Sequence, residues 1–74
     1  MKVDVKLNFY DIRVMVNGLP HVVIDRREYV GYQSYFENET KCTIEFYTKT
    51  NVIVCEYDSI EKWKKILKAL NDKL

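Results

Sequence analysis

Few side chains in this sequence are of the types that perform catalysis. His21 is the only histidine, and it follows Pro20 in a predicted turn, where a lone histidine most often lies at the surface. Cys42 and Cys55 lack the histidine and cysteine neighbours that a thiol nucleophile or a zinc site requires. We therefore predict that both cysteines are thiols of the hydrophobic core and that the protein holds no metal and no cofactor.

The other familiar catalytic patterns are also missing. No serine lies in the glycine-rich turn between strand and helix that hydrolases use, and Gly18 and Gly31 are too far apart to form a phosphate-binding loop. Glu45 and Glu56 are expected to lie near each other across a hairpin, but on the solvent-facing side of its strands. The sequence therefore predicts a protein that is not an enzyme.

The C-terminal residues are basic. Residues 59–74 carry five lysines and two acids, whereas residues 1–58 carry seven basic and nine acidic residues. A basic stripe can follow a nucleic-acid backbone while tyrosines stack on bases, but lysines on a C-terminal helix also complement the helix dipole. Because the formal net charge is only +1, we favour a solvated face. Nucleic-acid binding is the alternative, through Arg26, Arg27, Lys62, Lys64, Lys65 and Lys68.

Tyrosine and valine supply the second candidate surface. Alternation along the predicted strands places them on the sheet face that the helix does not cover. Tyrosines interspersed with polar side chains are typical of surfaces that bind proteins. In a small barrel, by contrast, the first strands would cover these residues, and the sequence does not decide between barrel and open sheet. The candidate protein-binding residues are Tyr29, Tyr35, Tyr47, Val52 and Val54.

A hairpin and a helix in the second half of the chain organise these surfaces. Period-two alternation over residues 42–47 and 52–57 pairs Phe46 with Ile53 and Ile44 with Cys55 across a polar turn. One face of this hairpin is then apolar: Cys42, Ile44, Phe46, Ile53, Cys55 and Tyr57. At Asp58 the period changes to that of a helix, which is predicted from Ser59 to about Asn71, with Trp63 buried against the hairpin.

The first half of the chain reads as strands and turns. Residues 2–9 alternate cleanly, and the phase then changes at Phe9 and Tyr10, which indicates a β-bulge or a bend between two parts of a sheet. Two strand segments are therefore expected, over residues 2–9 and 10–16, which can form one curved strand. Asn17 and Gly18 predict a tight turn into a short strand over residues 21–24. A further strand over residues 29–36 is expected to place Val30, Tyr32 and Phe36 on the core face.

Together these elements predict one α+β domain over residues 1–74. A curved antiparallel sheet of about five strands packs against one C-terminal helix, in the order β-β-β-β-β-α. No apolar run approaches the length of a membrane span and the first residues do not resemble a signal peptide, so we expect a cytoplasmic protein without membrane contact.

These observations favour a small non-catalytic module that occupies a protein surface, either as a homodimer or on another protein. Residues with AT-rich codons (Phe, Tyr, Met, Ile, Asn, Lys) number 31, against seven with GC-rich codons (Gly, Ala, Arg, Pro). That bias is typical of AT-rich bacteria, phages and mobile elements, and it suggests an inhibitor of host or defence machinery. A third alternative is a binder of small ligands or lipid headgroups in the mouth of a curved sheet.

Overall fold

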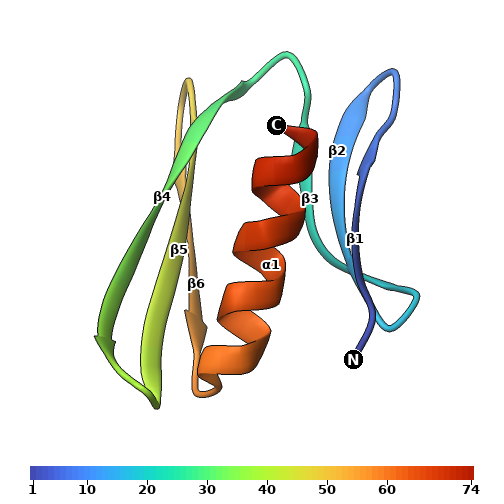
Figure 1. Cartoon of the computed structure of the whole chain (residues 1–74). Helices are drawn as coiled ribbons and strands as arrows, with labels where there is room; N and C mark the ends of the chain where they lie inside the picture. Colours follow the sequence, from blue (N-terminus) through green and yellow to red (C-terminus); the bar gives the residue numbers. More distant parts are fainter.

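The computed structural model, which describes residues 1–74, contains two antiparallel sheets and one helix (Figure 1). The first sheet has the strand order β1-β2-β3 and the second has the order β4-β5-β6. The elements are β1 Val3–Leu7, β2 Asp11–Val16, β3 Leu19–Asp25, β4 Tyr29–Asn38, β5 Lys41–Thr48, β6 Val52–Tyr57 and α1 Ile60–Lys73. The predicted α+β class is confirmed, but the single sheet of about five strands is wrong, because six strands divide between two sheets.

The extra strand arises from a turn at residues 8–10. The Asn8 backbone N–H donates to the Asp11 carbonyl over 2.8 Å, which closes the turn between β1 and β2. Phe9 and Tyr10 project from its tip and are 83% and 72% exposed. The two expected segments are therefore separate strands joined as a hairpin, and the expected β-bulge or bend within one curved strand is wrong. Aromatic residues are rarely found at the tip of a turn, so the sequence did not indicate one here. The polar residues that close this turn, Asn8 and Asp11, lie on either side of the aromatic pair.

The turn between β2 and β3 forms where it was predicted. Asn17 and Gly18 both have positive φ, at 53° and 79°, as a tight two-residue hairpin of the type I′ class requires. Leu19 pairs with Val16 and Pro20 with Met15, so β3 begins at Leu19 and not at His21, and the register shifts between Val14 and Met15. His21 itself has no pairing partner in the ladder.

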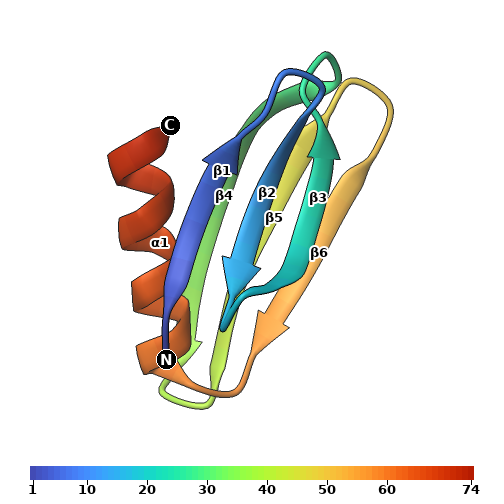
Figure 2. The same ribbon diagram turned by 90° about the vertical axis from the view of Figure 1, so that its right-hand side faces the viewer.

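The two sheets face each other, and α1 fills the open side between β1 and β4 (Figure 2). Twelve buried residues form one core cluster between these three layers. The first sheet contributes Val5, Ile12, Val14, Val22 and Ile24, the second contributes Cys42, Ile44, Phe46 and Tyr57, and the helix contributes Trp63, Ile66 and Leu70. The hairpin register of β5 and β6, with Phe46 opposite Ile53 and Ile44 opposite Cys55, is confirmed.

The helix begins at a serine cap. The Ser59 hydroxyl accepts a hydrogen bond from the Lys62 N–H over 3.3 Å, and α1 continues to Lys73, slightly beyond the predicted end. The buried Trp63 indole N–H donates to the Thr43 carbonyl over 3.0 Å, which ties the helix to β5. The helix shares the apolar face of β5 and β6 with the first sheet, so it does not cover that face alone as expected.

Strand β4 differs in part from its prediction. Tyr32 is opposite Phe46 and packs against the core as expected. Phe36 is opposite Cys42 and points to the helix side, where its ring meets Trp63, but it remains 54% exposed. The pairing is irregular between Tyr29 and Gly31, and Val30 in that irregularity is 64% exposed. The expected burial of Val30 is therefore wrong, because the bulge changes the side to which the residue points.

The sequence left open whether the strands form an open sheet or a small barrel, and the structure has two separate open sheets. The first sheet covers the inner face of the second sheet, while the outer face of the second sheet has no layer over it (Figures 1 and 2). No helix in the structure is long and apolar enough to cross a membrane.

Candidate protein-binding surface

The outer face of the second sheet gathers most of the predicted protein-binding residues. Because Cys42, Ile44 and Phe46 point inward, the alternate residues of β5 point outward, and their strand partners follow. Tyr47 lies opposite Val52, and Glu45 lies between Gln33 and Val54. We call this surface the tyrosine–valine face: Gln33, Tyr35, Thr43, Glu45, Tyr47, Val52, Val54 and Glu56.

A polar network holds the two tyrosines of this face in place. The Tyr35 hydroxyl donates to Gln33 Oε1 over 2.5 Å. The Tyr47 hydroxyl lies 2.7 Å from Glu45 Oε1 and 3.1 Å from Gln33 Oε1, and its single proton goes to the carboxylate as the stronger acceptor. The two hydroxyl oxygens are 3.5 Å apart. Neighbouring side chains therefore fix both rings by their polar ends.

The network also keeps Tyr47 neutral. The neighbouring Tyr35 hydroxyl, and then the hydrogen bond to Glu45, raise the pKa of Tyr47 well above its ordinary value of 10.0. The negative charge of Glu45 acts in the same direction. Tyr47 therefore stays protonated even at alkaline pH where an ordinary tyrosine ionises, and it presents an aromatic ring with a fixed hydroxyl.

Valines and carboxylates complete the face. Val52 and Val54 are 45% and 52% exposed, and Tyr35 is 48% exposed. Glu45 and Glu56 form none of the ion pairs of the structure, while Lys41 pairs with Glu37 over 3.3 Å beside the turn from β4 to β5. The middle of the face is thus apolar and aromatic with unpaired negative charge.

Tyr29 is the predicted residue that the face does not include. It lies opposite Thr48 in the ladder, packs against the core, and is only partly exposed. Burial, and then the nearby Tyr32, raise the pKa of Tyr29 above 10.0. The irregular pairing after Tyr29 places it on the inner side, away from Tyr35 and Tyr47.

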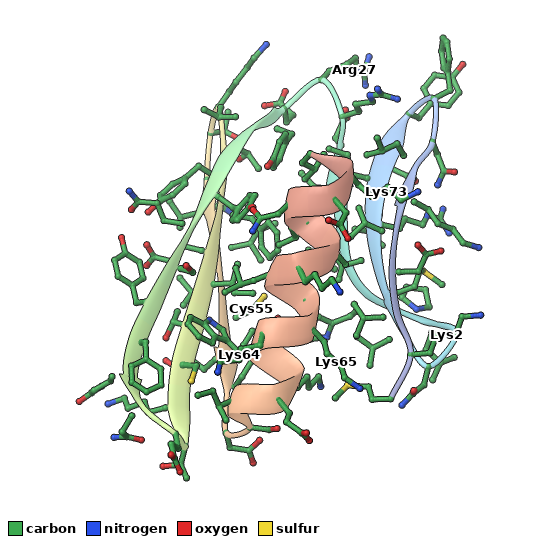
Figure 3. The ribbon with its side chains drawn as sticks, in the orientation of Figure 1. Lys2, Arg27, Cys55, Lys64, Lys65 and Lys73 are labelled. Carbon is green, nitrogen blue, oxygen red and sulfur yellow. The ribbon has the colours of Figure 1, made fainter.

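The basic residues of the alternative site do not form one stripe. Arg26 donates to the Asn8 carbonyl over 2.9 Å, and Arg27 pairs with Asp25 over 3.1 Å. Figure 3 shows Arg27 near the end of the molecule where the helix finishes, whereas Lys64 and Lys65 project from the first half of the helix. Lys65 donates to the Met1 carbonyl over 3.2 Å.

The two remaining lysines differ in their surroundings. The Lys62 ammonium lies 5.8 Å from the centre of the Tyr57 ring, as in a cation–π contact, and Lys68 is exposed. The six basic side chains therefore divide between the turn from β3 to β4 and separate positions along the helix.

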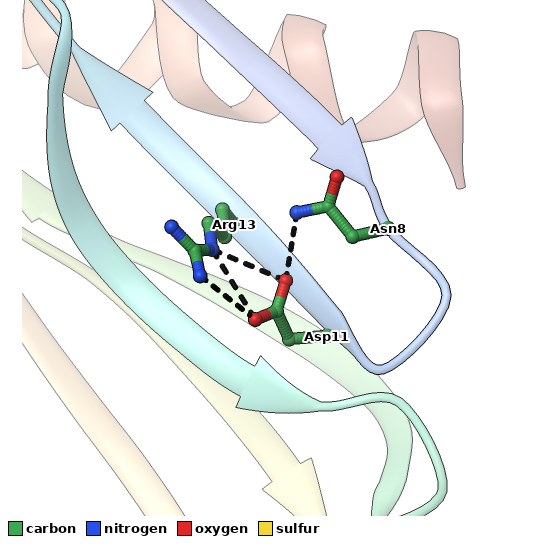
Figure 4. A network of polar contacts seen from close by, with 3 residues as sticks. All are labelled: Asn8, Asp11 and Arg13. Atoms are coloured by element: carbon green, nitrogen blue, oxygen red, sulfur yellow. Dashed lines mark hydrogen bonds and ion pairs between the residues drawn. The ribbon is translucent and has the colours of Figure 1, made fainter.

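Sequence reasoning missed the exposed aromatic turn of the first sheet. The Asp11 carboxylate accepts a hydrogen bond from Asn8 Nδ2 over 2.8 Å and forms an ion pair with Arg13 over 3.1 Å (Figure 4). Side chains therefore hold the base of the turn from both sides. Hydrogen bonds from Arg13 and then Asn8 lower the pKa of Asp11. The rings of Phe9 and Tyr10 meet edge to face with their centres 4.7 Å apart. The signal available was Asn8 and Asp11 three residues apart.

A second missed feature joins the two sheets. His21 Nε2 lies 2.7 Å from the hydroxyl of the buried Tyr57, with Cys55 two residues before it on β6. Burial raises the pKa values of both Tyr57 and Cys55, so the thiol stays protonated and is a weak nucleophile. The contact bridges β3 and β6, and no group of three metal-ligating side chains surrounds it.

Comparisons with known proteins add no assignment. No protein-family model, curated protein or solved structure matches this chain.

Proposed function

We propose that the protein is a non-catalytic protein-binding module and that its binding surface is the tyrosine–valine face. The observation that carries this proposal is the uncovered outer face of the second sheet, which exposes Tyr35, Val52 and Val54 together. Tyrosine is enriched among the side chains that contribute most to protein interfaces. The face lies on regular strands, which position side chains more rigidly than loops do.

Rigidity of the tyrosines supports the same function. A side chain that is already ordered loses less conformational entropy on binding, and this favours affinity. Tyr35 and Tyr47 are ordered through Gln33 and Glu45. The partner therefore meets two rings whose orientation is set in advance.

The charge of the face indicates the chemistry of the partner. Glu45 and Glu56 have no cationic partner within this chain, and both lie next to exposed apolar or aromatic groups. Arginine or lysine on a partner can pair with these carboxylates while its alkyl stem packs on tyrosine. The proposed partner is thus a protein surface with basic side chains between apolar ones.

That the protein inhibits the partner it binds is a more specific prediction than protein binding itself. A module that binds a protein without catalysing a reaction changes its target by covering a surface. The AT-rich residue composition adds the suggestion of a phage or mobile element and of a target in host or defence machinery.

Affinity capture with matched variants tests the proposed surface. Tagged wild-type protein and Tyr35→Ala would be incubated with nuclease-treated lysate of an AT-rich bacterium, and bound proteins would be quantified by mass spectrometry. Tyr10→Ala is the control, because it removes a tyrosine of the first sheet that is more exposed than Tyr35, at 72% against 48%. We expect one protein in stoichiometric amount, retained by the control and reduced at least about tenfold by Tyr35→Ala, which corresponds to about 1.4 kcal/mol.

Two results would contradict the proposal. If Tyr10→Ala abolishes capture and Tyr35→Ala does not, the binding surface is the aromatic turn of the first sheet. If every specific protein disappears on nuclease treatment, the basic residues bind nucleic acid and that alternative replaces protein binding.

A further inference from the structure

Strand β6 ends the second sheet with an edge to which no strand is paired (Figure 2). The Thr48 N–H donates to the Asn51 carbonyl over 2.9 Å, so these two residues form a hydrogen-bonded pair of the antiparallel ladder. Hydrogen-bonded and non-hydrogen-bonded pairs alternate along such a ladder. Ile53 and Cys55 therefore bond to β5, and the backbone groups of Val52, Val54 and Glu56 point away from it.

One of these outward groups is already satisfied. The Val52 N–H donates to the Asn51 side-chain oxygen over 2.8 Å. The N–H groups of Val54 and Glu56 and the carbonyls at positions 52, 54 and 56 remain for water or for another strand. Such a row of donors and acceptors is a template for strand addition.

The other edges of the two sheets are protected. The helix lies along β1, where Lys65 bonds to the Met1 carbonyl. Strand β4 has two irregularities in its pairing, and it contacts the helix through the Phe36 and Trp63 rings, whose centres are 5.8 Å apart. The covering helix on β1, and the irregular pairing and helix contact of β4, hinder the addition of a further strand to these edges.

Edge β3 is protected by its sequence. Pro20 provides no N–H, and the pairing shift that leaves His21 unpaired distorts the strand. Strand β6 contains no proline, lysine or arginine, and its pairing with β5 is regular over all of its residues. Among the four edges, β6 alone is regularly paired with its neighbour, uncovered and rich in β-branched residues.

We propose that β6 pairs with β6 of a second copy of this chain, antiparallel and centred on Val54. In this register the N–H of Val54 in each copy donates to the Val54 carbonyl of the other. The N–H of Glu56 in each copy likewise donates to the Val52 carbonyl of the other. All four free N–H groups of the two edges are thereby paired, and the two second sheets become one continuous sheet of six strands.

The side chains make this register self-complementary. The two exposed Val54 side chains meet at the two-fold axis, and each Glu56 lies opposite a Val52. Thr50 comes opposite Asp58, which brings the exposed Lys49 of one copy near the acidic end of β6 in the other. If the two-fold axis lay at Glu56 instead, the two Glu56 carboxylates would face each other, which is unfavourable.

Self-complementarity favours a second copy over an unrelated extended segment as the occupant. The formal net charge of +1 gives little repulsion between two copies. Because one strand pair is a small interface, we expect a dimer that dissociates on dilution. The dimer joins two tyrosine–valine faces side by side, but it forms through the strand edge and needs no other partner.

Purified protein tests the proposal without any partner. Sedimentation velocity over about a hundredfold range of concentration should show reversible dimerisation of the wild type. Val54→Lys and Val54→Glu should each weaken it at least about tenfold, because like charges then face each other at the two-fold axis. An equimolar mixture of these two variants should form a heterodimer, which also shows that both variants are folded. Val23→Lys, at a comparably exposed valine on edge β3, should dimerise like the wild type.

A further variant tests the register. Val52→Lys places a lysine opposite Glu56 of the other copy, so it should tighten the dimer about two- to tenfold. A wild type that remains monomeric at every concentration would overturn the proposal. So would dimerisation of Val54→Lys at wild-type strength, or dissociation caused by Val23→Lys. Because these experiments contain no other protein, self-association can fail while capture through Tyr35 succeeds, and the reverse also holds.

Discussion

The two sheets of this protein have the same strand number and the same antiparallel order, yet their outer faces differ in chemistry. The outer face of the first sheet is mainly charged, with Asp4 and Lys6 on β1 and the ion pair of Asp11 and Arg13 on β2. The outer face of the second sheet carries tyrosine and valine, with two glutamates that have no ion-pair partner. A charged face favours water as its neighbour, whereas the second face gains from being covered.

The edge strands β3 and β6 differ in the same way as the two outer faces, because only β3 has features that discourage association. Strand β3 carries Pro20 and a pairing shift, while β6 carries neither. On the side of the molecule where β3 and β6 lie, the features that discourage association therefore belong to the first sheet: a proline, a pairing shift and a charged outer face. This difference supports our proposal that association takes place through the face and the open edge of the second sheet.

The largest predicted effect tests whether the two sheets depend on one core. Trp63→Ala removes a buried ring that contacts β5, and such truncations cost about 3–5 kcal/mol. A domain of this size has only about 5 kcal/mol of stability in total. We expect both sheets to unfold together, as measured by circular dichroism and by backbone amide spectra. A cooperative melt near the wild-type temperature, or unfolding of one sheet alone, would contradict a shared core.

A smaller effect tests the rigidity of the tyrosine–valine face. Tyr35→Phe removes the neighbouring hydroxyl that raises the pKa of Tyr47, and Glu45→Gln replaces its charged hydrogen-bond acceptor with a neutral one. Each variant should therefore move the titration of Tyr47 toward 10.0, as followed by NMR of proteins with labelled tyrosine rings. Glu56→Gln on the same face is the control and should leave that titration unchanged. An unchanged Tyr47 in the first two variants would show that the network does not order the ring.

The smallest effect concerns the contact between β3 and β6. Burial, and then the positive charge of Lys62, lower the pKa of His21 below its ordinary value of 6.5. The unfolded chain consequently binds a proton more readily than the folded protein in the range below pH 6.5. The stability that His21 provides is present above pH 6.5 and decreases as the pH falls through its folded pKa. Chemical denaturation at several pH values should show this decrease in the wild type and a weaker one in His21→Gln.

Much of the second sheet could be predicted from the sequence because its signals are local. Strict alternation fixes which face of β5 and β6 is buried, and the change of period at Asp58 fixes where the helix begins. The placement of Tyr47, Val52 and Val54 on one outer face follows from that register. Tyr29 could not be placed in the same way, because the pairing irregularity beside Gly31 depends on the neighbouring strand.

The division into two sheets could not be predicted because it rests on contacts between distant residues. Phe9 and Tyr10 have strong strand propensity, and the turn that displays them is stabilised by Arg13 and by the Arg26 contact to the Asn8 carbonyl. The contact of His21 with Tyr57 likewise joins residues far apart in the chain. A lone histidine after a proline carries no local signal for such a partner.

Amide hydrogen exchange of the wild-type protein at several concentrations tests the central claim most directly, because β3 and β6 are compared in one sample. Exchange at Val54 and Glu56 should slow as the concentration rises, since their N–H groups become bonded only when a second copy is added. The outward amides of β3 should exchange at rates that do not depend on concentration. Rapid, concentration-independent exchange at Val54 and Glu56, or new protection on β3, would contradict the assignment of association to the second sheet.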